Sequence, residues 1–307
     1  MPVIASTPAW SGIPYAKGHG TQNDFVLLPD PDGHLDLSAP RVVALCDRRA
    51  GIGGDGVIRV VRSGALPEGV ELSGTAEWFM DYRNADGSAA EMCGNGMRLF
   101  VAYLLHAGLV TLADGESLDV GTRAGVKRVR REGELFAVDL GPWSVVGGER
   151  AAAAGTDATV RVAGDPVPLP GLSVETGNPH TVVALPDAER LAAADLTVAP
   201  AVEPRPAQGS NVELVVPLHD ATATVGHLAM RVHERGVGET RSCGTGAVAA
   251  VLAARVWGGA TSPDVWQVDV PGGRLRVTVP SSDLLAGAGV ELAGPAVVVA
   301  EGRLVDL

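Results

Sequence analysis

The feature that most constrains this chain is a Cys-Gly-polar-Gly motif that occurs twice, each time opening an apolar run. Residues 93–96 read CGNG and precede MRLFVAYLLHAG, whereas residues 243–246 read CGTG and precede AVAAVLAARVWGG. Each run predicts a helix of about three turns that stops at a glycine. Because almost no residue in either run is polar, each helix must be enclosed, and we expect a sheet wrapped around each one.

The cysteine of each motif stands where its helix begins. Unpaired N–H groups and the helix macrodipole favour a thiolate at Cys93 and Cys243, and also an anion bound beside each. We therefore expect each helix to lower the thiol pKa from about 8.5 toward neutrality. The donors to the bound anion would be the backbone N–H groups of the two residues after each cysteine: Gly94, Asn95, Gly244 and Thr245.

The repeat extends beyond the cysteines. Asn23 leads into an apolar strand upstream of the first motif, and Asn178 leads into another upstream of the second. The order of Asn turn, strands, Cys-Gly motif and buried helix thus occurs twice, which predicts two homologous domains that face each other. We expect one domain at 1–122 plus 290–307 and the other at 123–289.

Composition supports two folded domains and excludes several classes of partner. A chain of 307 residues can bury two cores, and its 40 Gly and 21 Pro suit strands and tight turns. The net charge of −12 argues against binding to nucleic acid or an anionic membrane surface. No apolar run reaches the roughly 18 residues of a membrane span. The N-terminus lacks a secretory signal pattern, so we expect a cytoplasmic protein with reduced thiols.

Local patterns predict several further elements. We expect a short helix near 39–47, a strand at 57–62 and a low-complexity loop at 147–158. The stretch 264–307 shows only strand patterns, and its last strand is expected to complete the sheet of the first domain. Residues 1–12 carry no periodicity and predict a loose extension.

Two other uses of the cysteines are weaker. No Cys or His pair has metal-ligand spacing, so we predict no metal site. A single thiol nucleophile with His180 as its base would leave one of the two identical motifs unused. Cys46, with no glycine loop behind it, predicts an ordinary buried thiol.

Two thiols that face each other across a cleft suit one reaction in particular. A thiolate removes a carbon-bound proton from one face, and a thiol returns a proton to the other, which inverts the stereocentre. The pair would be coupled, with one sulfur charged while the other is neutral. A proton beside a carboxylate is weakly acidic, so its removal needs electrostatic help at that carboxylate. No P-loop or dinucleotide-binding motif is present, so we expect no cofactor.

Six motifs together resemble the diaminopimelate epimerase family, over roughly residues 14 to 307. They are NDFV, DRRAGIGGDG, NADGSxxExCGNGxR, GNPH, GSNV and ERGVGETxSCGTGA. The resemblance implies an α/β (α+β) fold of two pseudo-symmetric domains, each a barrel-like, mostly antiparallel sheet around a central buried helix. It also implies cofactor-independent conversion of LL-2,6-diaminopimelate to the meso isomer, for lysine and cell-wall synthesis, by a homodimer.

The resemblance also assigns roles to residues. Cys243 would be the base in the LL-to-meso direction and Cys93 the acid, with the roles reversed in the other direction. His180 and Glu234 would tune the thiols. The residues that would hold the amino-acid substrate, in particular its distal end, are Asn23, Asn84, Asn178, Asn211, Glu234 and Arg235. A distal carboxylate requires Arg and amide donors, and a distal ammonium requires acceptors such as Glu.

The chain departs from the family at a few positions. Gly56 stands where many members place a Gln that reaches the substrate, Gln22 replaces a common Gly, and Met97 replaces a small residue.

Two alternative functions stay open. One is a racemase or epimerase of a monocarboxylic amino acid such as proline or hydroxyproline, which would leave Glu234 and Arg235 unpaired. The other is an amino-acid-binding protein without catalysis.

Overall fold

The computed structural model describes residues 10–218, 224–280 and 283–305, which form two compact units. The described residues of Met1–Gly20, Asp24–Phe136 and Ala296–Leu307 make up the first unit, and Thr21–Asn23 with Ala137–Pro295 make up the second. Strand β7 (Leu135–Asp139) spans the boundary. None of the helices in these described ranges is both long and apolar enough to cross a membrane.

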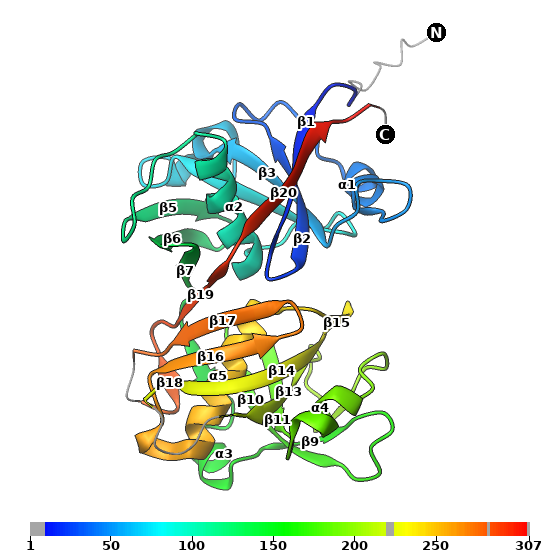
Figure 1. Ribbon diagram of the computed structural model, residues 1–307, viewed down its shortest axis with the longest axis vertical. Coiled ribbons are helices and arrows are strands. Elements are labelled where there is room, and N and C mark those ends of the chain that lie inside the picture. Colours follow the sequence, from blue (N-terminus) through cyan, green and yellow to red (C-terminus); the bar gives the residue numbers. More distant parts are fainter. Residues whose placement is uncertain (1–9, 219–223, 281–282, 306–307) are drawn as a thin grey trace. The chain divides into compact units, whose positions relative to one another are not determined.

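The first unit is a sheet around one helix (Figure 1). Its elements are β1 (Pro14–Gly20), β2 (Asn23–Pro29), α1 (Ala39–Cys46), β3 (Gly56–Arg62), the short 3-10 helices η1 (Ser63–Ala65) and η2 (Val70–Leu72), β4 (Trp78–Asn84), α2 (Gly94–His106), β5 (Ser117–Thr122), β6 (Gly125–Glu132) and β20 (Val297–Arg303). Hydrogen-bonded neighbours run in the order β20, β1, β2, β3, β4, β5, β6. Helix α2 packs against β1, β3, β4, β6 and β20, so strands enclose it.

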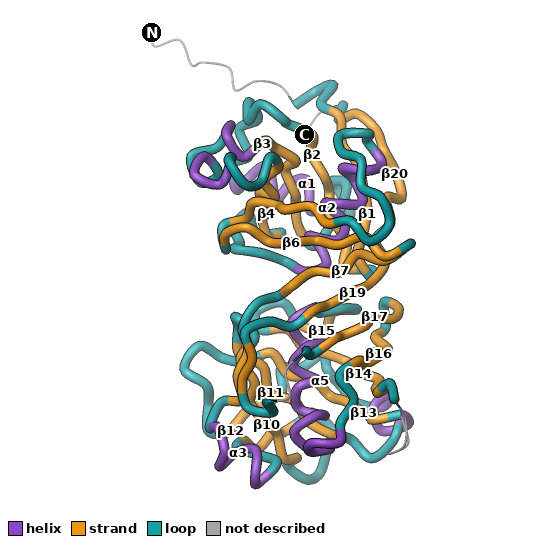
Figure 2. Tube along the Cα trace, turned by 90° about the vertical axis from the view of Figure 1, so that its left-hand side faces the viewer, coloured by secondary structure: helices purple, strands orange, loops and turns teal. Residues whose placement is uncertain are grey.

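The second unit repeats this arrangement around α5, which Figure 2 shows among the strands. Its elements are β8 (Trp143–Val145), α3 (Gly148–Ala154), β9 (Ala158–Arg161), β10 (Leu169–Glu175), β11 (Pro179–Ala184), α4 (Ala188–Ala193), β12 (Ala201–Glu203), β13 (Asn211–Pro217), β14 (Gly226–Glu234), β15 (Gly238–Thr240), α5 (Gly244–Gly258), η3 (Gly259–Thr261), β16 (Val265–Val270), β17 (Gly273–Thr278), β18 (Ala286–Gly287) and β19 (Glu291–Pro295). Neighbours run β8, β10, β11, β13, β14, β16, β17, β19.

The two units share one connectivity, which confirms the internal repeat. In the first, the parallel pairs β2–β3 and β4–β5 are joined through α1 and α2. In the second, the parallel pairs β11–β13 and β14–β16 are joined through α4 and α5. Most of the other strand pairs are antiparallel, so each sheet is mixed. The fold class predicted from the sequence is confirmed.

Both central helices form where their apolar runs predict, although each begins at the glycine directly after its cysteine and α2 ends at His106. Every residue from Gly94 to Val101 is buried, and so is every residue from Gly246 to Val256. The short helix α1 also lies where it was predicted. It covers the outer face of β2 and β3, where Val42 and Leu45 form a core with Val26, Leu28 and Val57. That second apolar layer explains why six of the seven residues of β3 are buried.

The boundaries between the compact units differ from the expected ones after residues 122 and 289. Strand β6 pairs antiparallel with β5 in a hairpin, with Thr122 opposite Gly125, so it stays with the first unit. Strand β19 pairs with β17, so residues up to Pro295 stay with the second. The last strand, β20, pairs antiparallel with β1, as the sequence predicted.

Two local predictions were wrong. The expected loop at 147–158 contains the helix α3, because four consecutive alanines have the highest helix propensity and left-handed Gly147 and Gly155 bound the helix. Residues 1–9 of the expected N-terminal extension lie outside the described residues. Trp10, however, is only 5% exposed and packs in the core beside α1, because its large ring fills space next to Val42 and Leu45.

The enclosure of α2 predicts an unequal response to two leucine truncations. Leu104 is fully buried on α2, whereas Leu109, just beyond the helix, is 41% exposed. Leu104→Ala should lower the free energy of unfolding by about 2–5 kcal/mol because it leaves a cavity. Leu109→Ala should change it by less than about 0.5–1 kcal/mol. Urea denaturation of both variants checks this, and equal losses would contradict an enclosed α2.

Candidate active site

Both predicted catalytic cysteines cap a central helix in the same way. Cys93 precedes α2 with φ −141° and ψ 120°, and its Sγ accepts the N–H of Gly96 at 3.4 Å. Cys243 precedes α5 with φ −122° and ψ 119°, and its Sγ accepts the N–H of Gly246 at 3.4 Å. Each sulfur therefore lies at the positive end of a helix dipole and receives one of the N–H groups that have no partner within the helix. None of the three cysteines, all of which lie in the described ranges, forms a disulfide.

The second glycine of each motif packs closely against the sheet of its own unit. A Cβ atom at Gly96 would lie 3.2 Å from Cδ1 of Ile58, which is tight against β3. A Cβ atom at Gly246 would lie 2.8 Å from Oε1 of Glu213, which is too close for any side chain. The Cys-Gly-polar-Gly spacing thus lets the start of each helix press against its own sheet.

In the second unit the predicted residues gather at the start of α5. His180 and Asn211 lie opposite each other on the parallel strands β11 and β13. The Nε2 atom of His180 lies 2.9 Å from Oδ1 of Asn178, and Oδ1 of Asn211 accepts the backbone N–H of Arg235 at 2.8 Å. The Arg235 guanidinium donates to the carbonyl of Gln208 at 2.6 Å. The structure therefore connects four predicted residues that come from three separate motifs.

Glu234 and Thr245 lie directly at the sulfur of Cys243. Glu234 ends β14 and accepts the Thr240 hydroxyl, and its carboxylate lies close enough to Cys243 to act on the thiol electrostatically. The Thr245 hydroxyl lies 3.5 Å from Sγ of Cys243. Glu234 therefore lies near this thiol, as predicted. Thr245, predicted to act only through its backbone N–H group, also contacts the sulfur with its side chain.

The charges around Cys243 overturn one expectation from the sequence. Burial, followed by the carboxylates of Glu234 and Glu213, raises the pKa of the Cys243 thiol well above its ordinary value. The bonds from Thr245 and the Gly246 amide oppose this rise without reversing it. The pKa of Glu234 is itself raised by burial. The helix N-terminus alone does not lower the thiol pKa here, because desolvation disfavours the thiolate and two neighbouring carboxylates repel it.

The first cysteine has a cation for a neighbour instead. Arg98, on the first turns of α2, has no exposed surface, and it donates to Oδ1 of Asn95 and to the Gly94 carbonyl. Burial lowers the pKa of Arg98 to about 10, and the negative charge of a Cys93 thiolate opposes that shift. The Asn95 side chain is therefore turned into the protein, so its predicted contribution to ligand binding falls to the backbone.

Asn84 ends β4, upstream of the first motif, where a neighbouring aromatic residue holds its side chain. The Tyr82 hydroxyl donates to Oδ1 of Asn84 at 2.9 Å, and Nδ2 of Asn84 donates to Ser88 at 3.0 Å. Gly56 lies opposite Asn84 on β3, where a Cβ atom would lie 2.7 Å from the Tyr82 ring. Because Gly56 has no side chain, the Tyr82 ring can occupy the space beside it. The sequence analysis did not predict this role of Tyr82. The signal was an aromatic residue two positions before the asparagine.

The remaining predicted positions are Asn23 and Cys46. Asn23 begins β2 and is half-buried, directly after Thr21 and Gln22, which have φ of 54° and 62°. Gln22 is thus left-handed where the family commonly has Gly, which explains that preference. Cys46 is buried in the core beside α1, and burial raises its pKa to about 11. The prediction of an ordinary buried thiol is confirmed.

Glu213 is the charged residue that sequence reasoning missed. Its side chain has no exposed surface, and Oε1 lies 2.7 Å from Nδ1 of His180. Burial raises the pKa of this carboxyl, although His180 opposes the shift. The signal in the sequence was a lone carboxylate inside the apolar strand NVELVVP.

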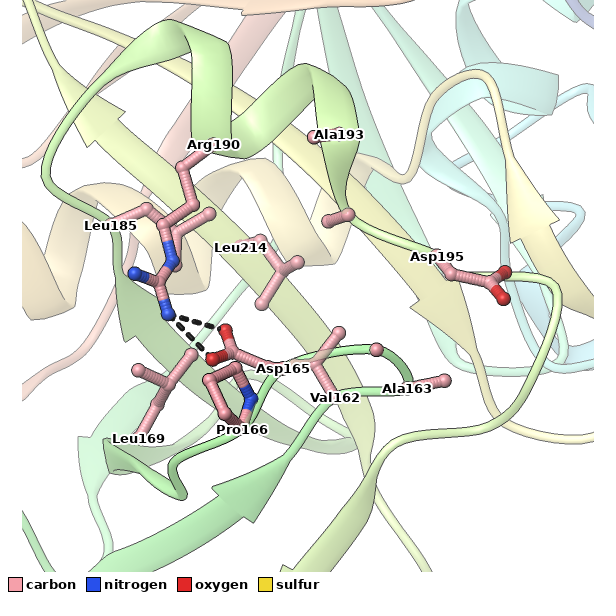
Figure 3. A pocket seen from close by; sticks show the side chains of 12 residues that line it. Val162, Ala163, Asp165, Pro166, Leu169, Leu185, Arg190, Ala193, Asp195 and Leu214 are labelled. Carbon is pink, nitrogen blue, oxygen red and sulfur yellow. Dashed lines mark hydrogen bonds and ion pairs between the residues drawn. The ribbon is translucent and has the colours of Figure 1, made fainter.

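A separate cavity of about 240 Å³ lies in the second unit (Figure 3). Arg190 and Asp165 stand across it and form two bonds, of 2.6 and 2.7 Å. Its floor includes the apolar side chains of Val162, Leu185 and Leu214. None of the predicted site residues lines this cavity, and its only charge pair is already neutralised, so it does not explain the motifs.

Comparison with solved structures shows the class of fold. The chain is similar to a Bacillus anthracis phenazine biosynthesis protein, with a TM-score of 0.63, 16% identity and coverage of 95% of this chain and 98% of that one. It is similar to a hydroxyproline epimerase from Agrobacterium vitis, with a TM-score of 0.62, 13% identity and coverage of 97% and 94%. The two-unit fold with a central helix in each unit is therefore shared with these two proteins.

Sequence comparison identifies the family. The family model for diaminopimelate epimerase matches residues 15–146 and 172–299. Diaminopimelate epimerase of Streptomyces coelicolor is 49% identical over 301 residues, which cover 95% of each chain. That of Thermobifida fusca is 49% identical over 298 residues, which cover 94% of this chain and 96% of the relative. The chain belongs to the diaminopimelate epimerase family.

The electrostatics of Cys243 predict the effect of one substitution on thiol titration. Glu234→Gln removes a carboxylate beside the sulfur, so the thiolate is less disfavoured and the pH midpoint of Cys243 alkylation should fall. Peptide mass spectrometry after iodoacetamide treatment across a pH series measures this midpoint.

The matched control is Glu239→Gln, which removes a carboxylate that pairs with Arg231 at 2.7 Å. It should leave the midpoint unchanged. An unchanged or higher midpoint in Glu234→Gln would show that this carboxylate does not raise the pKa of Cys243.

Proposed function

We propose that Cys93 and Cys243 act on opposite faces of one α-carbon of diaminopimelate and interconvert its LL and meso isomers without a cofactor. The observation that carries this proposal is the identical capping of two buried helices by cysteine, in a chain that belongs to the diaminopimelate epimerase family. One thiolate removes the proton and the other thiol supplies its replacement. In the LL-to-meso direction Cys243 is the base and Cys93 the acid, and the roles reverse for the return.

The different surroundings of the two sulfurs support a division of labour. Cys93 has the buried cation Arg98 near it, whereas Cys243 has Glu234 and Glu213. A thiol whose pKa is raised becomes the stronger base once it ionises. Glu234 lies near Cys243, and burial raises the pKa of its carboxyl, so it is placed to accept that proton. The ammonium of a bound amino acid would favour the same ionisation.

Recognition of the substrate is assigned to polar residues from both halves of the sequence. Asn23, Asn84, Asn178, Asn211, Glu234 and Arg235 would hold the amino acid, and the amides of Gly94, Asn95, Gly244 and Thr245 would donate to its reacting carboxylate. A monocarboxylic substrate such as proline would leave Arg235 without a distal anion, which favours diaminopimelate. We further propose that the chain acts in the cytoplasm as a homodimer, as its family resemblance implies.

The two-thiol proposal predicts the effect of removing each sulfur. Cys93→Ala and Cys243→Ala should each abolish inversion of LL-diaminopimelate and keep the circular dichroism spectrum of the parent. Cys46→Ala is the control, because that thiol lies in a core away from both motifs, and it should retain activity. Full activity in either of the first two variants would end the two-base proposal.

The assignment of Arg235 predicts a loss of affinity for a dicarboxylic substrate. Arg235→Met should lower kcat/KM for diaminopimelate by about 10- to 150-fold, the equivalent of one charge-assisted hydrogen bond of roughly 1.5–3 kcal/mol. Arg150→Met, on the exposed face of α3, is the control and should change nothing. Steady-state kinetics with diaminopimelate and with proline test this, and preferential turnover of proline by the parent enzyme would support the monocarboxylic alternative.

A further inference from the structure

Glu213 is a carboxylate of the second unit with no exposed surface, and the proposed mechanism uses it only as a charge near Cys243. It lies in the middle of the sheet on β13, and six of the seven residues of that strand are buried. Burying an ionised carboxylate without full compensation is costly. One carboxylate oxygen, Oε2, is buried and has no hydrogen-bond partner in the described part of the chain. The contacts of Glu213 must therefore explain how the protein accommodates this buried carboxylate.

The contacts of Glu213 lead to His180 and from there to Asn178. Oε1 of Glu213 lies 2.7 Å from Nδ1 of His180, and Nε2 of the same ring lies 2.9 Å from Oδ1 of Asn178. The side chains of Glu213 and His180 have no exposed surface, and Asn178 is half-buried. The three side chains thus form a chain of hydrogen bonds that begins in the core and ends at a residue with access to a ligand.

Counting protons along this chain fixes its charge. Both ring nitrogens of His180 face an oxygen, but a neutral imidazole carries only one N–H. Both contacts are hydrogen bonds only if the pair carries one extra proton, either as imidazolium with carboxylate or as imidazole with carboxylic acid. In both forms the net charge of the pair is zero. A neutral pair suits a fully buried position, since it leaves no uncompensated charge in the core.

The orientation of the Asn178 amide follows from the same count. Its Oδ1 accepts the N–H of His180, and the Thr176 hydroxyl lies 3.5 Å from the same oxygen. With Oδ1 occupied, the Nδ2 group of Asn178 points away from the ring. It makes no hydrogen bond to the residues that the structure describes, so its two N–H donors remain for a ligand.

We propose that Glu213 is a positioning residue, which shares one proton with His180 and so orients Asn178 to donate to a substrate carboxylate. This inference rests on the assignment of Asn178 to substrate binding. Without Glu213 a neutral His180 could present a bare Nε2 to Asn178. The amide would then turn its N–H group to the ring and its oxygen to the ligand, where it would repel a carboxylate.

Two substitutions separate the roles of shape, charge and proton. Glu213→Leu removes the proton-sharing partner but keeps an apolar side chain of similar size, so kcat/KM for LL-diaminopimelate should fall about tenfold, mainly through KM, as for the loss of one hydrogen bond. Glu213→Gln keeps kcat/KM within about threefold, because its amide N–H can bond Nδ1 and preserve the neutral chain. A loss in Glu213→Gln equal to that in Glu213→Leu would overturn the shared-proton account.

A double-mutant cycle with Asn178→Ala tests the route of the effect. If Glu213 acts through Asn178, Glu213→Leu should cost little in the Asn178→Ala background, whereas a merely structural role would give independent losses that multiply. Multiplying losses, or no effect of Glu213→Leu alone, would overturn the proposal. The cycle also separates the two proposals, since an unaffected KM in Asn178→Ala would refute the assignment of Asn178 while leaving the thiol chemistry untouched.

Discussion

The structure depends on one hydrogen bond that it uses twice, from a helix amide to a cysteine sulfur at the helix start. Gly96 donates to Cys93 and Gly246 donates to Cys243, both at 3.4 Å. The sulfur satisfies a backbone donor that would otherwise be buried without a partner. In each unit the cap therefore fixes where an enclosed helix begins and places a thiol at the end of the sheet that surrounds it.

The two caps share a geometry but not an electrostatic environment. The same helix dipole acts on each sulfur, yet the buried Arg98 lies near one, whereas the half-buried Glu234 and the buried Glu213 lie near the other. Burial strengthens both effects, because little water screens charges inside the protein. The repeated fold therefore places its two thiols in different electrostatic environments. A reaction that uses one acid and one base requires such a difference.

Local signals in the sequence were enough for most of the fold. Each of these signals spans only a few residues: the apolar runs of α2 and α5, the glycines around them and the repeated asparagine turns. The features that the sequence did not predict depend on contacts between residues that are distant in the sequence. Trp10 packs into a core through neighbours that no local pattern reveals, and Tyr82 fills the space above Gly56 from the adjacent strand. Glu213 is one polar residue in an apolar strand, and only the position of His180 on β11 reveals its hydrogen-bond partner.

The central claim is that two different groups handle the proton on the two faces of one carbon. It is tested most directly by epimerising LL-diaminopimelate in D₂O and analysing both isomers by mass spectrometry at low conversion. A thiol returns its own unexchanged proton to the substrate, whereas the opposite thiol delivers deuterium to the product. We therefore expect meso product with one deuterium at the inverted carbon and recovered LL substrate with almost none. Equal labelling of both isomers from the start would contradict it, because a single base would then serve both faces.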